Sequence, residues 1–122
     1  MDELIERLVA NVGIDRATAE KAIAIILDFL RKEGPADKVQ ALIDKLPGAE
    51  TLLKSHEAAE AGGGLFSMGG IMGAGTKLMG AGLSMGQVQA VTREVIGFAR
   101  ERLGEDAIGE IVGAIPGLSQ FI

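Results

Sequence analysis

Apolar residues recur at the three- and four-residue spacing of α-helices along nearly the whole chain, and no stretch alternates like a strand. This spacing predicts an all-α fold, a compact bundle of about six to seven helices. The predicted helices lie before Gly13, from Asp15 to about Glu33, around Val39 to Leu46, from Ala49 to about Glu60, from Met68 to about Ala81, from Ser84 to about Leu103, and around Ile108 to Ile115.

The helix ends carry recognisable signals. Asp15 is a good N-cap, and Ser84 with Gln87 forms a capping-box pattern that satisfies two free amide groups. At the break after the second helix, either Gly34 caps the next helix with Pro35 at its first position, or Asp37 is the cap.

The chain repeats itself at a constant offset of 69 residues from Gly13 to Gly48, with six identities in 36 pairs. Caps, breakers and apolar stripes agree as well, since Asp15 aligns with Ser84 and Phe29 with Phe98. We therefore expect two tandem three-helix units with pseudo-twofold symmetry, because a unit of this size buries its apolar face poorly alone.

The 122 residues are expected to form one domain, 1–122. The predicted parts are repeat unit 1 at about 1–48, a connecting helix at 49–60, a glycine-rich hinge at 61–67, and repeat unit 2 at about 68–117.

The chain resembles the VcgC/VcgE-like family of small bacterial helical domains of unknown function in three segments. These are Lys45 to Ala49 with Leu52-Leu53 after it, the glycine-rich middle, and Ala81 to Ser84. The resemblance covers nearly the whole chain. It implies an all-helical bacterial protein and carries over no catalytic residues.

Charge and composition exclude several functions. The net charge is −5 and no segment is strongly basic, which argues against nucleic-acid binding. There is no cysteine for a disulfide or a thiolate site, and no basic-then-apolar leader or spanning apolar segment. We expect a cytoplasmic protein without a transmembrane segment.

The residues from Gly62 to Gly82 hold half of the 18 glycines. A phosphate-binding loop needs Gly-Lys-Ser/Thr after a strand, but here Thr76-Lys77 stands in the reverse order and no strand precedes it. The dinucleotide fingerprint also fails, so no cofactor is expected. Glycine costs about 1 kcal/mol relative to alanine in a helix. So many glycines indicate that another backbone or a ligand approaches this segment closely.

The same segment is rich in methionine, which suits adaptable apolar surfaces. The candidate apolar interaction surface consists of Leu65, Phe66, Met68, Ile71, Met72, Met79 and Phe121. The alternative is that the methionines fill the core of the domain itself.

Polar candidates are few. His56 is the only histidine and lies among charges without the partners of a catalytic triad. Asp106 and Glu110 can share a face, but neither they nor any other residues form a recognisable metal loop. Arg31 and Arg100 recur at equivalent places, as a structural ion pair or, for each, a solvated charge. We therefore assign no catalytic, cofactor-binding or metal-binding residues.

These observations predict a non-enzymatic interaction or structural module that self-associates, as a homo-oligomer, or binds a protein partner through the Met/Gly surface. The alternative function is a carrier of a lipid or small apolar molecule, with its pocket beneath the glycine-rich segment. An enzyme that acts through His56 and nearby carboxylates is a third, remote alternative.

Overall fold

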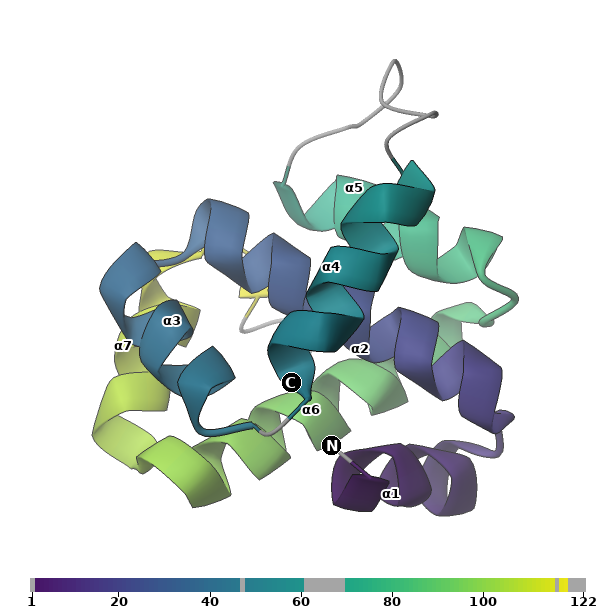
Figure 1. The fold of residues 1–122 in the computed structure, drawn as a ribbon, viewed down its shortest axis with the longest axis horizontal. Coiled ribbons are helices and arrows are strands. Elements are labelled where there is room, and N and C mark those ends of the chain that lie inside the picture. The colour runs from purple at the N-terminus through teal and green to yellow at the C-terminus, as the bar shows by residue number, and fades with distance from the viewer. Residues whose placement is uncertain (1, 47, 61–69, 116, 119–122) are drawn as a thin grey trace.

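The computed structural model describes residues 2–46, 48–60, 70–115 and 117–118, without the side chains of 56–60, 70–72 and 74. Within these ranges the chain forms seven α-helices and no strand, which confirms the predicted fold class (Figure 1). The helices are α1 (Asp2–Val12), α2 (Arg16–Glu33), α3 (Ala36–Asp44), α4 (Ala49–Glu60), α5 (Gly70–Gly80), α6 (Met85–Leu103) and α7 (Glu105–Ala114).

Most predicted helix ends are confirmed. Asp15 accepts a hydrogen bond from the Thr18 amide at the start of α2, and Ser84 forms the full capping box with Gln87 at the start of α6. Both alternatives for the start of α3 are wrong. The flanking residue is Pro35, whose backbone is extended with ψ 117°, so the helix begins one residue later and has no side-chain cap.

The long helix α2 lies in the middle of the bundle and contacts α1, α3, α4, α5 and α6 (Figure 1). Every residue from Ala22 to Leu30 is buried. These buried residues make α2 the central part of the hydrophobic core. Burial of apolar area is the main driving force for folding, so this helix contributes strongly to stability. The short helices α3 and α7 pack together at one end, while α1 and α5 flank the other.

Helix α1 is held on α6 by a cluster around Phe98, whose side chain is buried. The guanidinium groups of Arg7 and Arg102 lie 5.2 Å and 4.7 Å from the centre of the Phe98 ring. Each arginine also forms an ion pair to the opposite helix, Arg7 to Glu101 and Arg102 to Glu3. Such exposed ion pairs contribute little alone, so the aromatic contact and the apolar face of α1 matter more.

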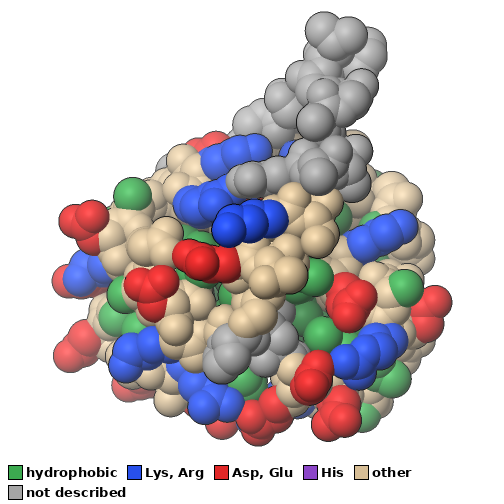
Figure 2. Space-filling model, viewed as in Figure 1, with side chains coloured by type: hydrophobic (Ala, Val, Ile, Leu, Met, Phe, Trp, Pro, Cys, Tyr) green, Lys and Arg blue, Asp and Glu red, His purple; other side chains and the backbone are tan. Residues whose placement is uncertain are grey.

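The surface in Figure 2 carries acidic and basic side chains side by side, with small apolar areas between them. None of the helices in the part of the chain that the structure describes is long and apolar enough to cross a bilayer.

Replacing glycine by alanine should have opposite effects on the free energy of unfolding at two positions. A Cβ at Gly34 would lie 2.7 Å from the Leu30 carbonyl oxygen and 3.3 Å from Val39, whereas a Cβ at Gly75 in α5 would meet nothing within 4 Å. We expect Gly34→Ala to lower the free energy of unfolding by about 1–3 kcal/mol through overpacking. Gly75→Ala should raise it by about 0.4–1 kcal/mol, because alanine restricts the unfolded chain.

Denaturant unfolding followed by far-ultraviolet circular dichroism measures both effects, since the chain has neither tryptophan nor tyrosine. Equal changes in the two variants would contradict the packing described for Gly34.

Candidate functional site

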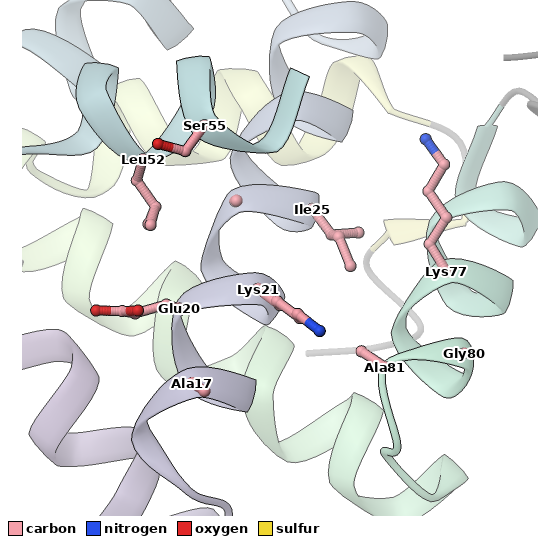
Figure 3. Close-up of a pocket in the computed structure, with 10 residues that line it drawn as sticks. Ala17, Glu20, Lys21, Ile25, Leu52, Ser55, Lys77, Gly80 and Ala81 are labelled. Carbon is pink, nitrogen blue, oxygen red and sulfur yellow. The ribbon is translucent and has the colours of Figure 1, made fainter. Parts of the chain in front are cut away.

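A groove of about 490 Å³ lies between α2, α4 and α5, beneath the glycine-rich helix (Figure 3). Among the described residues that line it, six of ten are apolar or glycine. The lining consists of Ala17, Glu20, Lys21, Ala24, Ile25, Leu52, Ser55, Lys77, Gly80 and Ala81. These are the lining residues that belong to the described part of the chain.

The groove exists because small residues face each other across it. Helix α2 contributes Ala17 and Ala24, while Gly80 at the end of α5 and Ala81, the next residue, contribute the facing wall. A Cβ placed at Gly80 would meet no atom within 4 Å, so no neighbouring side chain packs against this position. Leu52 of α4 reaches in from the third side (Figure 3). Helices α2 and α5 therefore pack on each other without filling the space beside their contact.

The expected close approach of another backbone is wrong at Gly75 and Gly80 of α5, where an added Cβ would meet no atom within 4 Å, whereas Gly73 of the same helix is buried. The Cβ positions of Gly75 and Gly80 are open rather than crowded. Gly80 is exposed and is one of the residues that line the groove. The second half of the expectation, a ligand close to the glycines, remains a prediction that fits this geometry.

Two lysines lie at the edge of the groove on opposite walls. Lys21 of α2 is exposed and its side chain extends toward Ala81, whereas Lys77 of α5 extends along the other wall (Figure 3). Glu20 leaves α2 in a different direction from Lys21 and lies 3.9 Å from Arg16. The groove is thus an apolar cleft with cationic edges in a chain of net charge −5.

Most of the predicted apolar surface lies outside the described residues. This applies to Leu65, Phe66, Met68 and Phe121, and to the side chains of Ile71 and Met72 in α5. The remaining member, Met79, is 44 % exposed, so the alternative that it fills the core is wrong for this residue. Met85, at the start of α6, is 56 % exposed.

The side chain of His56 in α4 also lies outside the described residues, and so does the predicted hinge at 61–67. Glu110 forms an ion pair with Lys38 of α3, which shows how one of the two acids proposed as a cation pair is used. Among the described residues, no group of three or more histidine and acidic side chains could hold a metal ion.

A buried acid was missed by the sequence analysis. The side chain of Asp28, in the middle of α2, is 5 % exposed and forms ion pairs with Arg31 at 3.1 Å and Lys32 at 2.9 Å. The expectation of a solvated charge is therefore wrong for Arg31. Arg100 at the equivalent place is exposed and has no ion pair within the described residues.

Burial raises the pKa of Asp28, but hydrogen bonds and charges from Lys32 and Arg31 outweigh it, so the pKa falls below its ordinary 3.8. A carboxyl with a lowered folded-state pKa stabilises the fold above its unfolded pKa and loses this effect as the pH falls through its folded pKa. This acid therefore makes the stability of the protein depend on pH below about 4.

Asp28→Asn should lower the free energy of unfolding by roughly 1.5 kcal/mol at pH 7, and by progressively less as the pH falls below 4. Denaturation midpoints between pH 7 and pH 2.5 measure this, with the exposed Glu6→Gln as the matched control. A difference between wild type and Asp28→Asn that stays constant over this range would show that the ion pairs of Asp28 do not stabilise the fold.

No protein-family model, curated protein or solved structure matches this chain. The resemblance to the VcgC/VcgE-like family, the bacterial origin and the cytoplasmic location therefore stay predictions from the sequence. The functional assignment depends on the geometry of the site alone.

Proposed function

We propose that this chain is a non-enzymatic binding protein that takes a small apolar molecule into the groove between α2, α4 and α5. The observation that supports this is an open cleft of about 490 Å³, whose described lining residues are mainly apolar or glycine. Sites for small molecules have volumes of about 300–1,000 Å³, a mostly apolar lining and a few polar groups at defined places. The cleft agrees with each of these features.

The groove suits a flexible apolar chain better than a protein helix. A helix with its side chains is about 10–12 Å across and rises about 5.4 Å per turn, so roughly one turn would fill the volume. One turn offers few contacts for specific binding, whereas a small molecule could lay most of its length along the apolar wall of the cleft. Ile25 and Leu52 provide the apolar surface that such a molecule would cover.

A larger side chain in the groove should weaken binding. Ala81 is half-buried and its side chain points into the groove (Figure 3), so Ala81→Leu should weaken binding of an apolar probe at least about tenfold through steric overlap. The neutral dye N-phenyl-1-naphthylamine reports binding by its fluorescence, and the exposed Ala10→Leu in α1 is the matched control. Equal binding of the dye to both variants would rule out this groove as its site.

We also keep self-association or partner binding as the second candidate, because Met79 and Met85 expose large apolar side chains. They lie at the end of α5 and the start of α6, six positions apart along the chain. Exposed apolar area of this kind is a common feature of protein interfaces. It would place the interface beside the groove rather than in it.

If this surface associates, the double variant Met79→Gln/Met85→Gln should stay monomeric at concentrations where the wild-type chain forms dimers. Sedimentation equilibrium with interference optics measures the mass without relying on aromatic absorbance. Val9→Gln, which changes the other large apolar side chain that is exposed in the described structure, is the control. A dimer that persists in the double variant, or a wild-type chain that stays monomeric, would count against this candidate.

We further propose that the two predicted repeat units pack with pseudo-twofold symmetry. Adding 69 to Arg16, the first residue of α2, gives 85, the first residue of α6. The N-caps Asp15 and Ser84 share φ −78°, with ψ 168° and 167°, and the glycines two residues before them both have positive φ. In addition, α1 packs on α6 while α5 packs on α2, so each long helix contacts the short helix of the other unit.

A further inference from the structure

The charges at the groove define the ligand more narrowly than its volume does. Lys21 Nζ forms no ion pair within the described residues, and its nearest acidic neighbour along the helix, Glu20, lies beside Arg16 instead. The hydrogen bond from Thr18 lowers the pKa of Asp15 most; the charge of Lys21 also lowers it by a Coulombic interaction, but Lys21 and Asp15 form no ion pair. An ammonium group that faces a groove without a carboxylate partner offers a place for a negative charge.

Lys77, on the opposite wall, already has an interaction within the chain. Lys21 is therefore the cation that remains available to a ligand. Its aliphatic stem runs over the apolar wall while its ammonium group reaches toward Ala81 at the rim (Figure 3). Of the apolar lining residues, Ile25 of α2 is buried and Leu52 of α4 is half-buried, whereas Lys21 is exposed. The order from rim to floor is thus cationic, then apolar.

Building on the proposed function, we propose that the natural ligand is a single-chain amphiphile with one negative charge on its head group, such as a long-chain carboxylate. Its alkyl chain lies against Ile25, Leu52 and the small residues of α5, and its carboxylate accepts a hydrogen bond from Lys21 Nζ. A single lysine is a compact point charge that matches one anionic group. A cationic amphiphile would meet repulsion at the same place.

Three ligands with the same alkyl chain test the inference by isothermal titration calorimetry below their micellar concentrations: dodecanoate, dodecanol and dodecyltrimethylammonium. Dodecanoate should bind about tenfold more tightly than dodecanol, and the cationic ligand most weakly. Shortening the carboxylate should weaken binding by about fourfold for each methylene withdrawn from the groove. Raising the salt concentration should weaken dodecanoate and not dodecanol.

Lys21→Met keeps the apolar stem and removes the charge, so it should abolish the preference for dodecanoate over dodecanol. Lys45→Met, an exposed lysine at the end of α3, removes the same charge away from the groove and should leave the preference intact. If dodecanol binds the wild-type protein as tightly as dodecanoate, the charge inference is wrong and the apolar groove stands. If no ligand of the three binds, both this inference and the proposed function are overturned.

Discussion

The packing of α2 on all sides is the constraint on which the rest of the structure depends. Five other helices contact it, and nine consecutive residues from Ala22 to Leu30 are buried. A helix in this position cannot have a polar face along its buried part, and the one acid there, Asp28, is held by two cations on the next turn. Helices α1, α3, α4, α5 and α6 each pack against α2, and these contacts set their positions in the bundle.

The groove follows from the way α5 covers its share of α2. At the end of α5, Gly80 and Ala81 have no side chain long enough to reach the small residues of α2, so space remains beside the contact. The 69-residue alignment pairs Ala24 and Ile25 of α2 with Arg93 and Glu94 of α6. The apolar floor of the groove is thus specific to α2, and the charged residues of α6 offer no comparable place.

The helices were predictable because their apolar stripes, caps and breakers are local signals. The broad apolar stripe of α2, which includes Ile25 and Phe29, is the local signal that agrees with its central position. The pocket beneath the glycine-rich segment was predicted as an alternative, but its walls were not, because Leu52 and Lys21 meet only through tertiary packing. The glycine content predicted a close approach of another backbone, which is wrong at Gly75. Composition does not distinguish a crowded position from an open one. The spacing of Asp28, Arg31 and Lys32 at i, i+3 and i+4 was a signal for the buried ion pair that the sequence analysis did not use.

The central claim is that the groove under α5 is a ligand site. A ¹H–¹⁵N NMR titration of the wild-type chain with dodecanoate tests it most directly, because it locates the bound molecule residue by residue. The largest amide shifts should fall on Ala17, Ala24 and Ala81, on both sides of the groove, while the amides of α7 stay unchanged. Shifts that centre on α7 or on the α1–α6 contact, with these three amides unmoved, would contradict the account.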